Sequence, residues 1–124
     1  MMTTSGGTVG KGSHASLSRF DMNNTLVAHG PNFKRGLINE IPSGNVDVAP
    51  TILWLLGVKP PATMDGRVLH EALVRSKTPT PTPEVKTLEA RREVGLFRWE
   101  QYLKFSTVGT TRYFDEGNGM ATRR

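Results

Sequence analysis

Apolar residues are concentrated in one stretch of the chain, the run Gly44-Asn-Val-Asp-Val-Ala-Pro-Thr-Ile-Leu-Trp-Leu-Leu-Gly57. Within this run, apolar residues recur at the spacing of one helix face, at Val48, Ile52, Leu55 and Leu56. The pattern predicts a short, largely buried helix over residues 46–56. Strand propensity from the β-branched residues favours the opposite assignment, but Pro50 would remove a ladder hydrogen bond from a central strand.

The ends of this helix are marked by three residues. Asp47 stands where its carboxylate can accept hydrogen bonds from the unpaired N–H groups of the next turn. Pro50 falls in the first turn, where a missing N–H costs nothing. Gly57 supplies the left-handed conformation that ends a helix. Asp47 is therefore interpreted as a structural residue.

A second apolar segment precedes the helix. Thr25–Ala28 is interpreted as a short buried strand that ends before Gly30-Pro31. We expect the helix to bury Ile52, Leu55 and Leu56 against this strand.

The chain after Leu73 has a different composition. Its Pro/Thr repeat, Ser76–Pro83, predicts a stiff, extended linker. Val85–Glu93 then predicts an edge strand. Tyr102–Val108 and Thr111–Asp115 predict a β-hairpin with its turn at Gly109, after which Met120–Arg124 should fray.

Composition narrows the classes of function. The chain has 124 residues, a net charge of +5 and no cysteine, so it can build one modest core without disulfides. Its basic residues are scattered and do not alternate with aromatic residues, which argues against specific nucleic-acid binding. No run is long enough to cross a membrane, and the first ten residues do not form a signal peptide. Localisation stays open.

Five motifs in a fixed order carry a resemblance to a known family. They are Gly12-Ser-His14, Leu26-Val-Ala-His-Gly-Pro31, Phe33-Lys-Arg-Gly36, Asn45–Gly57 and Met64-Asp-Gly-Arg-Val-Leu69. Together they resemble the C-terminal portion of the alkaline phosphatase superfamily. The most similar branch contains type I phosphodiesterases/nucleotide pyrophosphatases and sulfatase-like proteins. The resemblance covers roughly residues 10 to 73.

The resemblance implies an α/β fold class. The chain would be the C-terminal part of an alkaline-phosphatase-like α/β core, followed by a small antiparallel β-hairpin region. Its expected parts are a disordered N-terminal segment (1–13), the piece of the α/β core (14–75), the Pro/Thr linker (76–83) and the β-hairpin region (84–119). Asp65 and Gly66 match a turn after the helix and are interpreted as structural.

The candidate site residue is His14. It matches a zinc-ligating histidine of the family, so the resemblance implies a metal ligand there, although Ala15 stands where the family usually has glycine. The family's two-zinc site also needs further Asp and His ligands and a Ser or Thr nucleophile, which lie mostly upstream, and nothing in this chain resembles them. Considered without the resemblance, His14, His29 and His70 are lone histidines, which are usually surface residues.

The implied function is that of a C-terminal fragment of a metal-dependent phosphodiesterase- or phosphatase-type hydrolase, inactive alone. Its intact parent would act on phosphate or sulfate esters, often outside the cytoplasm, and the fragment would associate with the missing N-terminal part. The residues that select the ester lie upstream, so the ester class stays open. The alternatives are a small basic binding or interaction module and a non-catalytic remnant.

Overall fold

The computed structural model describes residues 16–123 of the chain. This part divides into two compact units, which we describe separately. The first unit contains the residues up to Thr25, Val85–Ser106 and the residues from Phe114 on. The second unit contains Leu26–Glu84 and Thr107–Tyr113.

The described chain contains short helices and long strands. In chain order these elements are α1 (Arg19–Met22), η1 (Asn45–Asp47), α2 (Val48–Leu55), η2 (His70–Ala72), β1 (Glu84–Val94), β2 (Phe97–Val108) and β3 (Thr111–Arg123). The longest of these helices, α2, has eight residues, whereas the strands have 11 to 13. The two η elements are single 3₁₀ turns.

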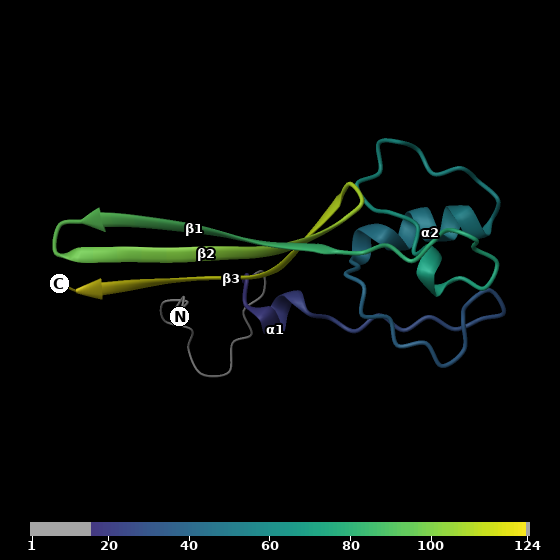
Figure 1. The fold of residues 1–124 in the computed structure, drawn as a ribbon, viewed down its shortest axis with the longest axis horizontal. Helices are drawn as coiled ribbons and strands as arrows, with labels where there is room; N and C mark the ends of the chain where they lie inside the picture. Colours follow the sequence, from purple (N-terminus) through teal and green to yellow (C-terminus); the bar gives the residue numbers. More distant parts are fainter. Residues whose placement is uncertain (1–15, 124) are drawn as a thin grey trace. The chain divides into compact units, whose positions relative to one another are not determined.

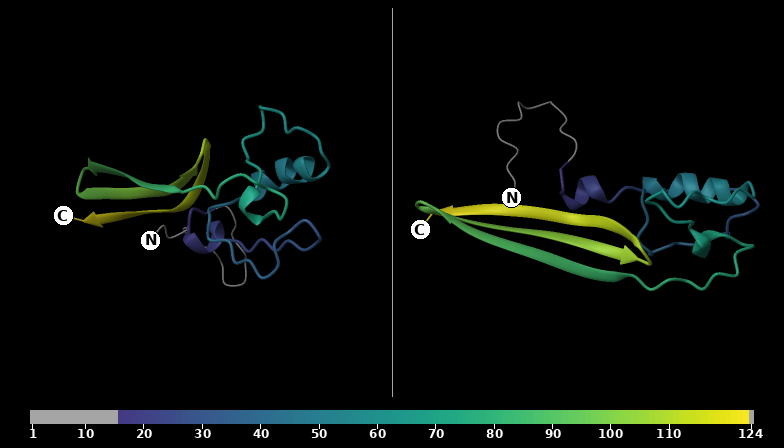
Figure 2. Two further views of the ribbon diagram at one scale, coloured as in Figure 1. Left: turned by 45° about the vertical axis from the view of Figure 1, so that its right-hand side comes forward. Right: turned by 90° about the horizontal axis from the view of Figure 1, so that it is seen from above.

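The three strands form one antiparallel sheet in the order β1-β2-β3, and they run side by side in Figure 1 and in both views of Figure 2. Two-residue turns join them, each with a glycine in the left-handed region, at φ 58° in Gly95 and 61° in Gly109. The predicted hairpin turn at Gly109 and the predicted edge strand are both confirmed. The expected fraying after Gly119 is wrong, because β3 continues to Arg123.

Two ion pairs show the register of β1 against β2. Arg91 Nε lies 3.5 Å from Glu100 Oε1, and Arg98 Nη2 lies 3.5 Å from Glu93 Oε1. Both pairs are symmetric about the turn at Gly95, as directly opposed residues of a hairpin must be. Because these side chains are exposed, the pairs set the register more than they add stability.

The predicted helix is confirmed as a 3₁₀ turn, η1, that continues into α2. Its end is set by local hydrogen bonds: the Val58 N–H donates to Leu53 O at 2.9 Å, and the Gly57 N–H donates to Trp54 O at 3.0 Å. With Gly57 at φ 74°, these bonds form a Schellman motif. The sequence therefore identified both the helix and the residue that ends it.

The predicted burial of this helix is wrong. In α2 the buried residues are Pro50 and Thr51, while Ile52 is 49% exposed and Leu56 is 71% exposed. The expected partner is also absent, because Thr25–Ala28 forms no strand and is exposed. A strand needs a neighbour for its backbone groups, and no described segment supplies one.

The core of the second unit forms around Leu69 and Leu73, which are both buried. Leu73 pairs with Phe33 in an isolated antiparallel bridge. The Lys34 N–H donates to Ala72 O at 2.9 Å, and the Val74 N–H donates to Asn32 O at 2.9 Å. This short pairing ties the loop after Pro31 to the chain that follows η2.

The predicted α/β fold class is wrong. Within residues 16–123 the sheet has three antiparallel strands and the helices are few and short, so this is not an alkaline-phosphatase-like α/β core. A parallel core needs strands connected by crossover helices, and the apolar runs of this chain do not provide them. No helix of the described part is long and apolar enough to span a membrane.

Candidate functional site

The most buried polar group of the second unit is the carboxylate of Asp47, at the end of η1. It is fully buried. It accepts hydrogen bonds from the Gly44 N–H at 2.8 Å, the Arg67 N–H at 2.8 Å and the Tyr113 hydroxyl at 2.9 Å. The predicted cap of the next turn is therefore wrong in detail, because the carboxylate reaches back to Gly44 and across to two distant residues. Its predicted structural role is confirmed.

Arg67 joins this carboxylate to a second one. Its guanidinium donates to both oxygens of Glu71, with Nη2 to Oε1 at 2.7 Å and Nη1 to Oε2 at 2.9 Å. It also donates to Pro42 O at 3.0 Å and, through Nε, to the Tyr113 hydroxyl oxygen at 3.0 Å. The bidentate pairing of Arg67 with Glu71 is the strongest hydrogen-bonding geometry between an arginine and a carboxylate.

The pKa values in this cluster reflect burial and pairing. Burial alone would raise the pKa of the Glu71 carboxyl, but its hydrogen bonds, above all those from Arg67, outweigh burial and hold that pKa below its usual range. Burial alone would lower the pKa of the Arg67 guanidinium, and Glu71 outweighs it to raise that pKa. Burial, followed by the hydrogen bond to Asp47, raises the pKa of Tyr113 to about 12.

Asp47, Arg67, Glu71 and Tyr113 form what we call the Asp47–Arg67 cluster. Each charged group in it is engaged by several partners, and no side-chain polar atom buried in the described chain lacks one. A closed network of this kind fixes the positions of η1, η2 and the start of β3. These hydrogen bonds give the cluster a structural role in the second unit.

The predicted metal ligand, His14, lies outside the described residues. Among residues 16–123, no three His, Cys, Asp or Glu side chains come together in a way that could hold a metal ion. The described residues therefore do not fit the two-zinc site that the resemblance implies.

His70 is half-buried and held in place, unlike the surface histidine that the sequence suggested. Its Nδ1 lies 3.0 Å from Ser76 Oγ, which accepts a further hydrogen bond from the Thr78 N–H at 3.2 Å. Its ring packs edge-on against Trp54, with centroids 5.4 Å apart. Burial lowers the pKa of His70. These contacts join α2 to the start of the Pro/Thr segment.

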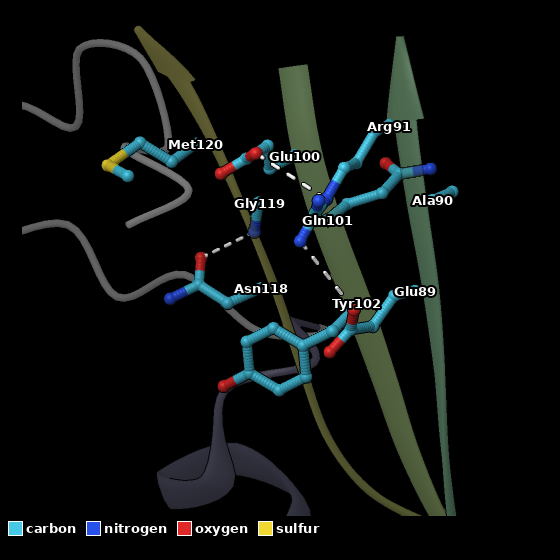
Figure 3. Close-up of a pocket in the computed structure, with 9 residues that line it drawn as sticks. All are labelled: Glu89, Ala90, Arg91, Glu100, Gln101, Tyr102, Asn118, Gly119 and Met120. Atoms are coloured by element: carbon cyan, nitrogen blue, oxygen red, sulfur yellow. Dashed lines mark hydrogen bonds and ion pairs between the residues drawn. The ribbon is translucent and has the colours of Figure 1, made fainter. Parts of the chain in front are cut away.

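The first unit carries an open groove of about 350 Å³ on its sheet (Figure 3). Arg91 lies between two carboxylates there, 3.5 Å from Glu100 and 4.0 Å from Glu89. Tyr102 and Asn118 line the same groove. Arg91 and the two carboxylates are paired with one another, and no nucleophile lies beside a base among the residues that line the groove, so we assign no catalytic chemistry to it.

Sequence reasoning missed three of the four members of the Asp47–Arg67 cluster. Arg67 belongs to a motif that was singled out, but its role was not inferred. Glu71 lies four residues after it, a spacing that favours an ion pair and could have been noticed. Tyr113 lies 66 residues from Asp47, and no local pattern could have linked these two.

Comparisons with known proteins give one partial similarity. No protein-family model matches the chain, and no solved structure matches it. Over 59 residues the chain is 42% identical to a Caenorhabditis elegans protein described as a homolog of the extracellular sulfatase Sulf-1. The matched stretch covers 47% of this chain and 8% of the worm protein, so the chain spans a small fraction of that relative's length. Sulfatases belong to the alkaline phosphatase superfamily, and the similarity points to a hydrolase of that superfamily at most.

Proposed function

We propose that this chain is a scaffold part of a sulfatase-like hydrolase, and that the catalytic groups lie on the remaining polypeptide of that enzyme. The observation that carries the proposal is the 42% identity to the worm sulfatase homolog over 59 residues. The matched stretch is 8% of the worm protein, so in that relative these residues are a minor part of a much longer chain.

A scaffold role agrees with the chemistry of the second unit. Its most buried charged groups, in the Asp47–Arg67 cluster, form hydrogen bonds that connect η1, η2 and the start of β3. Such a network stabilises a fixed geometry, which is what an active site assembled from several segments needs from its supports.

The proposed substrate is a sulfate ester. The choice of a sulfate ester follows from the name of the relative. The sequence alone left a phosphodiester substrate open as well. A phosphodiester substrate is the outcome against which the assay below is compared.

The proposed metal role of this chain is limited to His14. A neutral imidazole is a suitable zinc ligand, and the proposal takes the other ligands from the remaining polypeptide of the enzyme. When bound, zinc would supply charge stabilisation for the departing ester oxygen. His14→Ala should lower the zinc content of the assembled protein, with His29→Ala as the matched control. Equal zinc content in both variants would remove His14 from the proposal.

Complementation tests the function. The full chain is co-expressed with the worm relative from which the 59 matched residues have been deleted. We expect neither polypeptide alone to hydrolyse p-nitrocatechol sulfate, and the two together to form a complex that does. Bis-p-nitrophenyl phosphate is assayed in parallel and should be the slower substrate. If the two polypeptides neither associate nor hydrolyse either ester, the proposed function is wrong.

A further inference from the structure

The Pro/Thr repeat at the end of the second unit is a sequence motif that the proposed function leaves unused. Thr78-Pro-Thr-Pro-Thr-Pro83 places a proline directly after each threonine. From Pro79 to Pro83 the chain forms neither helix nor strand, and in Figure 1 it is drawn as a coil that leads into β1. A proline holds the residue before it in an extended conformation and has no backbone N–H to donate. The repeat is therefore an extended segment outside the sheet.

The prolines and threonines of this repeat have different surroundings. Pro81 and Pro83 are half-buried, whereas Thr80 and Thr82 are exposed. Pro81 also lines a cavity of about 290 Å³ in the second unit, together with Gly109 of the β2–β3 turn. Within the described chain the hydroxyls of Thr80 and Thr82 form no hydrogen bond. Pro81 thus anchors the segment, and the two threonine hydroxyls beside it are accessible from solvent.

Thr78 shares the Thr-Pro sequence but not these surroundings. Its N–H donates to Ser76 Oγ at 3.2 Å, and it lines the same cavity as Pro81. An enzyme that binds its acceptor as an extended peptide uses the backbone groups of that peptide as well as the reacting hydroxyl. The structure therefore separates Thr80 and Thr82 from Thr78, although the sequence treats the three alike.

Threonines that alternate with prolines are typical of O-glycosylated stalks. We propose that Thr80 and Thr82 are acceptor sites for O-linked sugars, with a nucleotide-activated N-acetylhexosamine as the donor. In this step the threonine Oγ1 attacks C1 of the sugar, the bond from C1 to the nucleoside diphosphate breaks, and the diphosphate leaves. The hydroxyl proton passes to the leaving diphosphate. The inference goes beyond the proposed function and does not rest on it.

A sugar suits this segment better than a phosphate, which is the other common modification of a threonine before a proline. Glu84 lies two residues after Thr82, and a phosphate on Thr82 would add like charge beside that carboxylate. A neutral sugar adds no charge, and its bulk suits a surface position. The surroundings of Thr82 therefore favour the sugar.

Mapping of the modified residues tests the proposal. The full chain, purified from bacteria without sugars, is incubated with UDP-N-acetylgalactosamine and a polypeptide N-acetylgalactosaminyltransferase, and electron-transfer mass spectrometry locates the sugar. We expect N-acetylhexosamine on Thr80 and Thr82, and on Thr78 in a much smaller fraction of the chains. Thr63 and Thr87 are exposed threonines without a following proline, so they serve as internal controls and should carry none.

A parallel reaction compares the sugar with a phosphate. The full chain is incubated with ATP and a proline-directed protein kinase, and the rate of each enzyme is scaled to that on its own standard peptide. We expect sugar transfer to Thr80 and Thr82 to be the faster reaction on this scale. Faster transfer of phosphate would overturn the proposal.

A double variant provides the control for folding. Thr80→Val combined with Thr82→Val removes both hydroxyls, keeps the β-branched shape and should abolish the sugar on the repeat. Because these hydroxyls form no hydrogen bond in the described chain, the double variant should melt at the wild-type temperature. If neither residue of the wild-type chain accepts the sugar, or if Thr63, Thr78 or Thr87 accepts it equally well, the surroundings do not select these two sites and the proposal is wrong.

Discussion

Removing one hydroxyl tests whether the Asp47–Arg67 cluster holds the second unit together. In Tyr113→Phe the ring remains, so the packing of this buried residue is kept. Two hydrogen bonds are lost: the one that the hydroxyl donates to Asp47 at 2.9 Å and the one that it accepts from Arg67 Nε at 3.0 Å. The substitution therefore isolates the polar contribution of the phenol.

The size of the effect follows from what remains. A hydrogen bond to a charged group contributes about 1.5–3 kcal/mol, so two such bonds set an upper range of about 3–6 kcal/mol. The Asp47 carboxylate keeps two backbone donors, and Arg67 keeps Glu71 and Pro42 O as acceptors. Because the remaining partners compensate in part, we expect a loss of about 3 kcal/mol in the free energy of unfolding of the second unit.

Fluorescence of Trp54 provides the assay. Trp54 lies on α2 in the second unit, and Trp99 lies on β2 in the first unit. Replacing Trp99, which is exposed, by Phe leaves Trp54 as the reporter for urea unfolding at pH 7.5. Tyr102→Phe is the matched control, since no hydrogen bond of the Tyr102 hydroxyl is seen in the described chain, and it should change stability by less than about 0.5 kcal/mol. A loss below about 0.5 kcal/mol in Tyr113→Phe would refute the reasoning.

The same residue predicts behaviour at high pH. The pKa of Tyr113 is about 12 in the folded chain, against an ordinary value of 10. Between these values the unfolded phenol has lost its proton and the folded one has kept it, so stability falls as pH rises from 10 to 12. Two pKa units correspond to about 3 kcal/mol. The difference in stability between wild type and Tyr113→Phe should therefore shrink over this range.

Three further outcomes are expected. Glu71→Gln should lower the free energy of unfolding by about 3 kcal/mol at neutral pH, because it leaves the Arg67 charge without its partner. The pKa of Glu71 lies below 4.5 in the folded chain, so this loss should persist above pH 4.5 and fade at lower pH. Urea titrations at several pH values measure both. Gly66→Ala should lower stability by about 3 kcal/mol or prevent folding, because its Cβ would lie 2.0 Å from Val46 O, and thermal melts measure this. Arg91→Ala should change the melting temperature little, because its ion pairs are exposed.

Each of these outcomes has a control. Gly44→Ala should be tolerated, because a Cβ there would meet its nearest neighbour at 3.5 Å, an ordinary contact. Glu93→Gln removes an exposed carboxylate and should show none of the pH dependence expected of Glu71→Gln. An equal response of Gly44→Ala and Gly66→Ala would contradict the close backbone approach at Gly66. A large destabilisation by Arg91→Ala would show that the β1–β2 ion pairs carry stability after all.

The wrong predictions of burial share one cause. The helix over residues 46–56 and the strand at Thr25–Ala28 were both assigned from apolar patterns, and both were expected to be buried. The patterns describe which faces are apolar, but burial requires a second surface. In this chain that surface is absent among the described residues, so Ile52, Leu56 and Val27 remain exposed.

What the sequence determined by itself is the local chemistry of turns and ends. Gly57 ends α2 and Gly109 turns β2 into β3, because each needs a positive φ that glycine adopts without strain. The tertiary structure alone decided the fold class and the cluster, because both depend on distant residues. Asp47, assigned as a local helix cap, binds Arg67 20 residues away and Tyr113 66 residues away. A buried carboxylate takes whichever donors the folded chain places around it, and those donors are fixed only when the segments meet.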